Sequence, residues 1–573
     1  MASDHAGVVS VRASGRCDMI IWRCCHGFSA KGLTLMGSLP GGVSKSRGAG
    51  ATPSPFSLRA GITGLYRRAD LAPAVLIIAG ISFAVHVVFA NNYGYFRDEL
   101  YFMAMSHHPA FGYVDVPPLV AWITLIPRFL TGNALWALHV ISALVCAAVI
   151  VLTGLIARLL GGAGWVQGLA ALGSATSLVL LAGGSTYTYD VFDQFWWALA
   201  ATVLIVLLRD GRPRLWLAFG VVAGLGLLTK ETMLFWGFAL VLGLLLTPQR
   251  RLLFTSWTLY GGIIALAIFS PFLLWNAANG WASFQYWAAY SANHSGGGTP
   301  IDFLVNQILV NNPFLLPLWG AGLWYFFFSA RGKRYRVFGW AYVILFVLFI
   351  LIQGKSYFLA PAYPVLFAGG AMQWGQLRVR WPRWGPRWVA GYALLLVLGA
   401  VLLAPAAMPV LPPTAYAHVY GTAGNSGAQQ QSGDVYGLPQ SLADRFGWPE
   451  QVALIAQVYH SLPPSEQRVA CIFASNYGEA GALEQFGERY HLPLPISGHN
   501  AFYIWGPGGC TGQVIISIGV TPQTADAAYG SVTLAGRTSC KACVDFENNA
   551  AILILRDPKE PFSAIWAQAK MYE

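Results

Sequence analysis

Residues 71–90, LAPAVLIIAGISFAVHVVFA, decide the fold, because these twenty positions contain no Asp, Glu, Lys or Arg. A helix of roughly 20 apolar residues crosses the hydrocarbon core of a bilayer. Similar runs recur along the chain and together predict a polytopic helical bundle. The eleven apolar stretches are residues 71–90, 134–157, 165–184, 191–208, 215–228, 233–247, 252–278, 311–330, 337–352, 357–375 and 388–409.

The composition supports a membrane protein. The 573 residues are 56% hydrophobic and 10% charged, with a mean hydropathy of +0.52, whereas soluble domains carry about 25% charged residues. This deficit excludes a disordered protein, a basic nucleic-acid-binding domain and an ordinary cytosolic enzyme. The whole chain has a net charge of +11, but residues 410–573 are acidic, with eight basic and thirteen acidic residues. The basic excess therefore indicates membrane topology rather than nucleic-acid binding.

The distribution of Lys and Arg predicts the orientation. With the N-terminus inside and alternating loops, sixteen basic residues of the membrane part fall in inner loops. The outer loops hold four, which are Arg97, Arg128, Lys230 and Lys355. Because cytoplasmic loops carry the excess of basic residues, we expect a multi-pass protein of the inner membrane. Its N-terminus is expected in the cytoplasm and its C-terminal part on the periplasmic side.

The predicted fold class is mainly α, a bundle of about eleven spans followed by a small soluble α/β domain. The predicted parts are a disordered tail (1–65), a transmembrane domain (66–410) with long outer loops at 91–133 and 279–310, a linker rich in Gly, Ser and Gln (411–433), and an extracytoplasmic α/β domain (434–573). In this last domain we expect strands at 469–474, 514–518 and 552–555, and helices at 450–460 and 479–490.

Four cysteines lie in the predicted outer domain, where an oxidising compartment permits disulfides. They are Cys471, Cys510, Cys540 and Cys543. The Cys540–Cys543 pair has CxxC spacing, which is compatible with redox or metal chemistry as well as with a stabilising bridge. One or two stabilising bridges are the expectation.

Charged residues beside membrane spans are costly and indicate function. Here they gather at the outer ends of the spans, as Arg97, Asp98, Glu99, Asp115, Asp190, Asp193, Lys230, Glu231 and Lys355. Residues 95–105 have apolar positions at helical spacing and predict a helix along the membrane interface. For Asp98 and Glu99, the alternative is a solvated helix start, where acidic side chains favour the helix dipole.

The chemistry that fits such a site is transfer from a lipid-phosphate-linked sugar. The sequence has no Walker loop and no dinucleotide GxGxxG fingerprint. A phosphate is already a competent leaving group, so Lys or Arg need only neutralise its developing charge. One carboxylate can take the proton from the acceptor hydroxyl. A single attack at the anomeric carbon then inverts its configuration.

Three segments carry a family resemblance, residues 94–101 (GYFRDELY), 112–119 (GYVDVPPL) and 354–364 (GKSYFLAPAYP). Together with residues 187–194 and 228–231, this set resembles GT-C glycosyltransferases of family 39. These are similar to bacterial protein O-mannosyltransferases and to the lipid A aminoarabinose transferase. The resemblance covers roughly residues 70–410 and implies a polyprenyl-phosphate sugar as the donor.

The resemblance also implies roles for individual residues. Asp98 matches the general base, and Glu99 would support it or orient the acceptor. Asp115 matches a residue that binds a metal or positions sugar hydroxyls. Lys355 matches a contact to the lipid phosphate, with Lys230 as a second candidate. Further substrate-binding candidates are Arg97, Tyr113, Asp190 and Tyr357.

Some positions depart from the family or have weaker support. The aminoarabinose transferases carry Lys directly before Pro-Pro, where this chain has Val116, which weakens an assignment to aminoarabinose. No cofactor is required, and a divalent metal ion would find its candidates in Asp115 and His294. Tryptophans beside the second long loop, Trp287 among them, would anchor the interface or stack on sugar faces.

The leading prediction is therefore an inverting glycosyltransferase that acts on an envelope acceptor, either a lipid, a glycan or a protein. The alternatives are a polytopic secondary transporter and a lipid-binding envelope-assembly protein. Intramembrane charges of a transporter should lie near the midplane between repeats. The enzyme instead requires Asp98, Asp115, Lys230 and Lys355 to surround one outward cavity.

Overall fold

The computed structural model describes residues 71–573 except 133, 294–298 and 422–435. The predicted tail at 1–65 and the metal candidate His294 lie outside the described residues. Thr63–Glu573 form one compact unit, so the membrane helices and the C-terminal domain are described together.

Each of the eleven predicted apolar stretches contains a helix or a helix pair. They are α2 (Pro73–Val88), α5 (Leu135–Leu159), α6 (Gly164–Ala175) with α7 (Leu178–Gly184), α8 (Tyr189–Asp210), α9 (Leu215–Leu227), α10 (Thr232–Leu245), α11 (Ser256–Ala278), α14 (Leu316–Phe328), α15 (Arg336–Leu351), α16 (Tyr363–Arg380) and α17 (Gly385–Leu403). In the described part of the chain, five helices are long and apolar enough to span a bilayer, or six with the bent pair. The mainly helical membrane fold is confirmed, while the count of eleven spans stays a prediction.

The third predicted stretch is broken rather than continuous. Its two halves, α6 and α7, meet at an angle of 69°. Two hydrogen bonds stabilise the bend. The Ser177 hydroxyl donates to Asn311 Oδ1 at 2.9 Å, and Asn312 Nδ2 donates to the Thr176 carbonyl at 3.2 Å. The apolar run alone gave no sign of this bend, because its partners lie more than 130 residues further along the chain.

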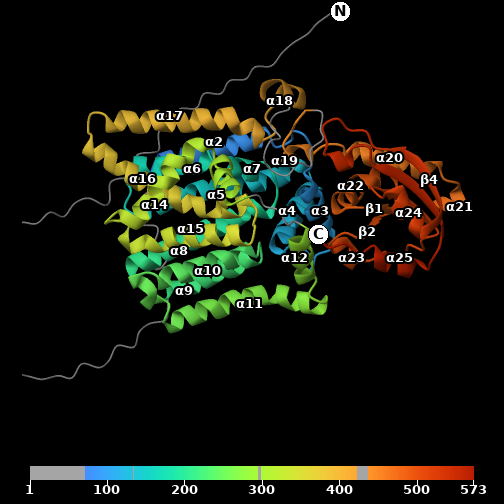
Figure 1. Ribbon diagram of the computed structural model, residues 1–573, viewed down its shortest axis with the longest axis horizontal. Coiled ribbons are helices and arrows are strands. Elements are labelled where there is room, and N and C mark those ends of the chain that lie inside the picture. The colour runs from blue at the N-terminus through green and yellow to red at the C-terminus, as the bar shows by residue number, and fades with distance from the viewer. Residues whose placement is uncertain (1–70, 133, 294–298, 422–435) are drawn as a thin grey trace, which may run out of the picture. The chain divides into compact units, whose positions relative to one another are not determined.

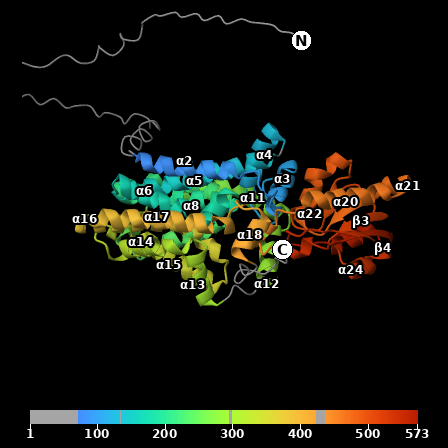
Figure 2. The ribbon, with the colours of Figure 1, turned by 90° about the horizontal axis from the view of Figure 1, so that it is seen from above.

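Shorter helices gather at the end of the bundle that faces the C-terminal domain (Figures 1 and 2). They include α3 (Arg97–His107), α4 (Leu119–Thr131) and α12 (Ala282–Asn293), while α13 (Pro300–Leu309) contacts the turn at Ser356–Ala362. The 3-10 turns of the membrane part are η1 (Pro248–Leu252), η2 (Pro313–Leu315), η3 (Lys333–Tyr335), η4 (Ser356–Ala362) and η5 (Ala404–Ala406).

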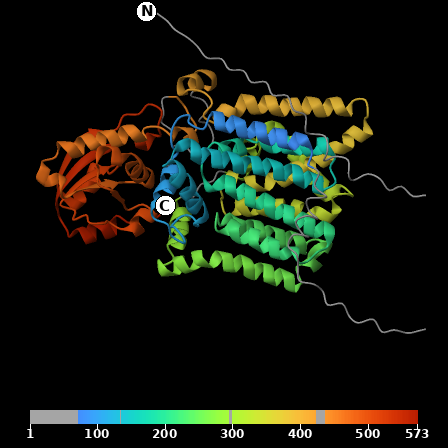
Figure 3. The same cartoon turned by 180° about the vertical axis from the view of Figure 1, so that it is seen from behind.

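The helix expected at residues 95–105 forms as α3, and protein covers it on both sides. Residues 99–106 of this helix are all buried, and the helix lies between the membrane bundle and the C-terminal domain, as the view from behind also shows (Figure 3). Leu100 and Phe102 share one apolar core with α5 on one side and with Leu483 and Ile516 of the C-terminal domain on the other. A helix buried on both sides reads as apolar around its circumference, and sequence periodicity cannot distinguish this from burial in lipid.

The C-terminal domain contains a five-stranded sheet of order β2-β1-β3-β5-β4, parallel from β2 to β3 and antiparallel beyond it. Its strands are β1 (Ala470–Ala474), β2 (Pro495–Ser497), β3 (Val514–Ile518), β4 (Tyr529–Arg537) and β5 (Ala551–Pro558). The three predicted strands are confirmed, and β2 and β4 are additions. β2 is only three residues long, and β4 is an edge strand whose side chains are mostly exposed or half-buried, so neither carries a strong apolar pattern.

Helices cover both faces of this sheet. The remaining elements are α18 (Pro413–Tyr420), α19 (Gln440–Ala443), α20 (Trp448–Ser461), α21 (Pro464–Gln467), α22 (Tyr477–Phe486), η7 (Gly487–Tyr490), α23 (Ala501–Trp505), α24 (Pro522–Ala528), η8 (Asp545–Glu547) and α25 (Phe562–Gln568). Both predicted helices are confirmed as α20 and α22, and α18 lies inside the predicted linker. Side chains alternate along the strands, so Ile516 joins the core shared with α3 while Ile515 joins the core under α24.

One of the expected disulfides is present. Cys471 and Cys510 are bridged across 39 residues, and this bond ties β1 to the loop before β3. Cys540 and Cys543 are free thiols, with the Cys543 amide donating to Cys540 Sγ at 3.1 Å.

Candidate functional site

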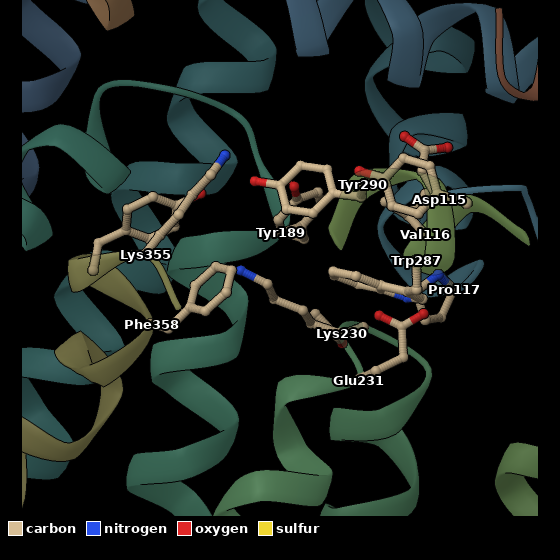
Figure 4. Close-up of a pocket in the computed structure, with 13 residues that line it drawn as sticks. Asp115, Val116, Pro117, Tyr189, Lys230, Glu231, Trp287, Tyr290, Lys355 and Phe358 are labelled. Carbon is tan, nitrogen blue, oxygen red and sulfur yellow. The ribbon is translucent and has the colours of Figure 1, made fainter. Parts of the chain in front are cut away.

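A pocket lies at the end of the bundle that faces the C-terminal domain, and it brings together much of the predicted set (Figure 4). It offers about 430 Å³ of space outside protein atoms, part of it open to the surroundings. Its lining residues are Asp115, Val116, Pro117, Tyr189, Thr229, Lys230, Glu231, Tyr286, Trp287, Tyr290, Lys355, Tyr357 and Phe358. They come from the loop before α4, the start of α8, the α9–α10 junction, α12 and η4.

Lys230 is held in an aromatic box. It lies at the junction of the two short helices α9 and α10, and its Nζ is 2.5 Å from Asp190 Oδ1. The ammonium group is 4.6 Å from the ring centre of Tyr189 and 5.0 Å from that of Phe358, between which Figure 4 shows it reaching. Such contacts favour a cation, so Lys230 presents a fixed positive charge to the pocket.

Lys355 is the less constrained cation. It precedes η4, and its Nζ is 5.2 Å from the ring centre of Tyr290 and 6.0 Å from that of Tyr357. Among the described residues, no carboxylate lies within ion-pair distance of it. An ammonium group that makes no ion pair with a carboxylate is well suited to receive an anionic ligand.

Asp98 lies beside the pocket rather than in its lining. It is the second residue of α3, and the Tyr477 hydroxyl donates a hydrogen bond to its Oδ1 at 2.9 Å. Burial raises the pKa of Asp98 above its usual range, against the opposing charges of Arg97 and Lys355. Lys355 therefore acts on both the pocket and this carboxylate, and a raised pKa suits a general base that works near neutral pH.

Asp115 lines the pocket and is oriented by a second phenol. The Tyr101 hydroxyl donates to Asp115 Oδ1 at 2.9 Å. Burial raises the pKa of Asp115 to about 7. The side chain stands in the loop directly before Pro117 and Pro118, whose fixed φ angles stiffen the backbone on this side of the pocket.

Glu99 has a different place from its neighbour. It is fully buried, and His139 Nε2 and the Tyr187 amide lie 2.8 and 2.7 Å from its Oε1. The Phe96 amide donates to its Oε2 at 2.9 Å, and the other nitrogen of His139 faces the Ala90 carbonyl. Both imidazole nitrogens of His139 therefore face oxygen atoms, one of the Glu99 carboxylate and one of the Ala90 carbonyl. Burial alone would raise the pKa of Glu99, but the charge and hydrogen bonds of His139 outweigh it and lower the pKa.

Glu99 is therefore a buried anchor of α3, and the solvated helix start expected as an alternative is wrong for this residue. The hydrogen-bond partners of its carboxylate, Phe96, His139 and Tyr187, do not line the pocket. The hydrogen bonds to His139 and Tyr187 connect α3 to α5 and to the start of α8. Adjacent residues of a helix point about 100° apart, so Asp98 and Glu99 face different surroundings. The sequence does not show which of the two faces the site.

Two further predicted contacts lie away from the pocket. Arg97 pairs with Asp444 at 3.3 Å and packs over the ring of Tyr477, so it connects α3 to the C-terminal domain. The Tyr113 hydroxyl donates to the Met105 carbonyl at 3.1 Å and is buried. Tyr113 therefore fixes the loop that carries Asp115 instead of facing a substrate.

Glu231, Tyr286 and Tyr290 line the pocket but were not predicted as site residues, whereas Trp287 was named as a residue that could stack on sugar faces. Glu231 points into the pocket below Trp287 (Figure 4), and its Oε1 is buried without a hydrogen-bond partner among the described residues. Tyr286, Trp287 and Tyr290 come from α12, where Tyr290 follows Tyr286 by four residues and Trp287 by three, so the rings lie on one side of the helix. This aromatic spacing was the signal that could have found them.

Within the described ranges, no group of three His, Cys, Asp or Glu side chains is arranged to hold a metal ion. Asp115 therefore stands as a single candidate ligand, and the other candidate lies outside those ranges.

Comparisons with known proteins agree with the fold. The model of the dolichyl-phosphate-mannose-protein mannosyltransferase family matches residues 115–275. A comparison with curated proteins finds no match. Among solved structures, ArnT from Cupriavidus metallidurans bound to undecaprenyl phosphate superposes with a TM-score of 0.51 at 15% identity, over 87% of this chain and 98% of that one.

Two other solved structures are more distant. Apo ArnT from Cupriavidus metallidurans gives a TM-score of 0.49 at 16% identity, over 87% of this chain and 98% of that one. The Archaeoglobus fulgidus oligosaccharyltransferase AglB, in complex with an inhibitory peptide and a dolichol-phosphate, gives 0.46 at 12% identity, over 87% and 77%. The family match and the fold shared with undecaprenyl-phosphate-bound ArnT confirm that this chain resembles the GT-C membrane glycosyltransferases of family 39.

Proposed function

We propose that this chain is an inverting glycosyltransferase of the inner membrane. It moves a sugar from a polyprenyl-phosphate donor to an envelope acceptor on the periplasmic side. The observation that carries the proposal is the convergence of Lys230, Lys355 and Asp115 on one pocket, with Asp98 beside it. The ArnT structure with undecaprenyl phosphate supports a lipid phosphate as the anionic ligand.

The donor phosphate binds at the lysines. A phosphodiester carries one negative charge in the donor and gains charge when its bond to the sugar breaks. Lys355 and Lys230 would stabilise that developing charge, which is the part of the reaction that an enzyme accelerates most directly. Because the phosphate leaves without protonation, the site needs no general acid.

The acceptor reacts at the carboxylate side. Asp98 accepts the proton of the acceptor hydroxyl while that oxygen attacks the anomeric carbon from the face opposite the phosphate. The carbon–oxygen bond to the phosphate breaks, its electron pair stays on the phosphate, and the product has inverted anomeric configuration. Asp115, Glu231 and Trp287 surround the remaining space and would orient the sugar through its hydroxyl groups and its face.

The alternatives lack a comparable observation. The charged groups of a transporter should lie near the midplane of the bundle, whereas Asp98, Asp115 and Lys355 gather at the end that faces the C-terminal domain. The arrangement of Asp98, Asp115 and Lys355 therefore favours chemistry over transport.

The test compares envelopes from cells that carry the wild-type chain, the Asp98→Asn variant or no copy. Mass analysis of glycolipids, glycans and glycoproteins should find a species heavier than its acceptor by one sugar in the wild type alone. The variant should be inserted at the wild-type level and accumulate the lipid-linked sugar. The same product in all three envelopes would exclude this reaction, and a normal amount in the variant would exclude Asp98 as the base.

A further inference from the structure

The C-terminal domain meets the membrane domain through two small residues of α22. A Cβ atom added at Gly478 would lie 2.5 Å from Arg97 Cγ, and one added at Gly481 would lie 2.8 Å from the backbone of Leu100. These glycines stand one helical turn apart, so α22 and α3 touch backbone to backbone (Figure 2). Such close contact fixes the residue at the start of α22, Tyr477, relative to α3.

Tyr477 is aimed at the catalytic carboxylate. Its hydroxyl donates to Asp98 Oδ1 at 2.9 Å. Its ring stacks on Tyr101 with centres 4.6 Å apart and an interplanar angle of 24°, and the Tyr101 hydroxyl donates to Asp115. The Ala501 amide donates in turn to the Tyr101 hydroxyl at 2.9 Å. Two stacked phenols thus serve the two carboxylates, and the C-terminal domain supplies one phenol and binds the other.

We propose that the C-terminal domain is a structural component of the catalytic centre, with Tyr477 as a positioning residue that holds Asp98 in its reactive orientation. This inference rests on the proposed function and deepens it. The phenol occupies Oδ1, so Oδ2 is the oxygen that accepts the proton of the acceptor hydroxyl. A carboxylate fixed by a donor and by the backbone contact of α22 keeps its geometry during the reaction, which is what a general base requires.

The hydrogen bond also sets the protonation of Asp98. A donor stabilises the charged carboxylate and lowers its pKa, while burial raises the pKa. Asp98 is surrounded by three tyrosines of the pocket and by six other charged or titratable groups. These six are Arg97, Asp115, Asp190, Lys355, Asp444 and Tyr477. Removal of the Tyr477 hydroxyl leaves the other groups in place, so the pKa of Asp98 should rise and the base should lose its proton only at higher pH.

The experiment measures pH profiles of kcat and of KM for the donor, using full-length Tyr477→Phe protein with a polyprenyl-phosphate sugar. Phe keeps the ring that stacks on Tyr101. We expect the acid limb of kcat to move to higher pH by about one unit, since one hydrogen bond to a carboxylate is worth about that much. Along that acid limb kcat should fall about tenfold at a given pH, with an unchanged KM for the donor. Tyr503→Phe, in the same domain, is the matched control and should leave the profile unchanged.

The position of the limb does not depend on how much of the sample is folded, so partial unfolding cannot imitate the shift. A fluorinated tyrosine at position 477, which is a stronger donor with the same shape, should move the limb to lower pH. A Tyr477→Phe profile that overlays the wild type, while Asp98→Asn is inactive, overturns the positioning role and leaves the proposed function standing. Turnover by Asp98→Asn at the wild-type rate overturns the base assignment itself, and the inference with it.

Discussion

The lysine side of the pocket and the carboxylate side at α3 are built from different parts of the chain. Lys230 and Lys355 stand at the ends of membrane helices, and rings from α8, α12 and η4 surround them. Asp98 instead lies at the contact between the membrane bundle and the C-terminal domain, held by a residue 379 positions away in sequence. Under the proposed function, donor binding is therefore expected to depend on the membrane domain, whereas the proposed base depends on the docking of two domains.

This difference gives the two sides different sensitivities. A substitution in the C-terminal domain should lower the rate of the chemical step and leave donor affinity unchanged. A change at the lysines should alter donor affinity first. Each prediction below either separates the two sides or shows that they act as one.

The largest effect is expected at the anchor of the carboxylate side. Glu99→Gln removes a fully buried carboxylate that pairs with His139 at 2.8 Å, and breaking a buried ion pair typically costs about 3–5 kcal/mol. We therefore expect a much lower melting temperature of the purified protein in detergent. Binding of polyprenyl phosphate by the fraction that remains folded should be normal.

The control for this anchor is His139→Gln combined with Glu99→Gln. Because the double variant leaves no unpaired charge, it should be less destabilised than the sum of the single variants. A fully stable Glu99→Gln protein that has lost donor binding would place Glu99 at the substrate instead.

The next effect belongs to the lysine side. Lys355→Ala removes a cation without a carboxylate partner, and a charge-assisted hydrogen bond is worth about 1.5–3 kcal/mol. The donor concentration that half-saturates the enzyme should therefore rise by about 10- to 100-fold. Lys559→Ala, on the outer surface of the C-terminal domain, is the charge-matched control.

Lys230→Ala provides an internal comparison. It also leaves Asp190 without its partner, which adds a repelling charge near the donor phosphate. Its effect on donor affinity should be at least as large as that of Lys355→Ala. If neither substitution changes the donor requirement, the pocket does not bind the lipid phosphate.

The smallest effect tests the contact between the domains. Gly481→Ala places a methyl group against the backbone of Leu100, and overpacking of this kind costs about 1–3 kcal/mol. We expect a several-fold lower rate of transfer with unchanged donor affinity. Gly509→Ala adds the same atom in the same domain where nothing lies within 4 Å, and it should behave like the wild type. Equal activity of the two variants would mean that the fit of α22 on α3 does not matter for transfer.

The lysine side was largely accessible from sequence. Charges that interrupt apolar runs are visible without a structure, and Lys230, Lys355 and Asp115 do converge on one pocket. The apolar stretches themselves predicted the helices well, because the 20-residue length of a span is set by the bilayer rather than by tertiary contacts.

The carboxylate side was not accessible in the same way. Asp98 and Glu99 are adjacent and chemically alike, and only the position of α3 decides that one reaches the site while the other pairs with His139. The burial of α3 depends on α22, which sequence patterns assigned to a separate domain. Tyr477 carried no local signal, since a tyrosine at a helix start has many roles.

The most direct test of the division between the two sides measures two quantities on the same samples. Wild-type, Asp98→Asn and Lys355→Ala proteins in nanodiscs would be assayed for the dissociation constant of a polyprenyl-phosphate sugar and for its single-turnover transfer at saturating donor. We predict that Asp98→Asn keeps the wild-type dissociation constant and loses transfer by about a thousandfold. Lys355→Ala should raise the dissociation constant, and at saturation it should lower transfer far less than Asp98→Asn does, because Lys230 still faces the charge that develops on the phosphate. If Asp98→Asn raises the dissociation constant as Lys355→Ala does, or if Asp98→Asn transfers at the wild-type rate, the account is contradicted.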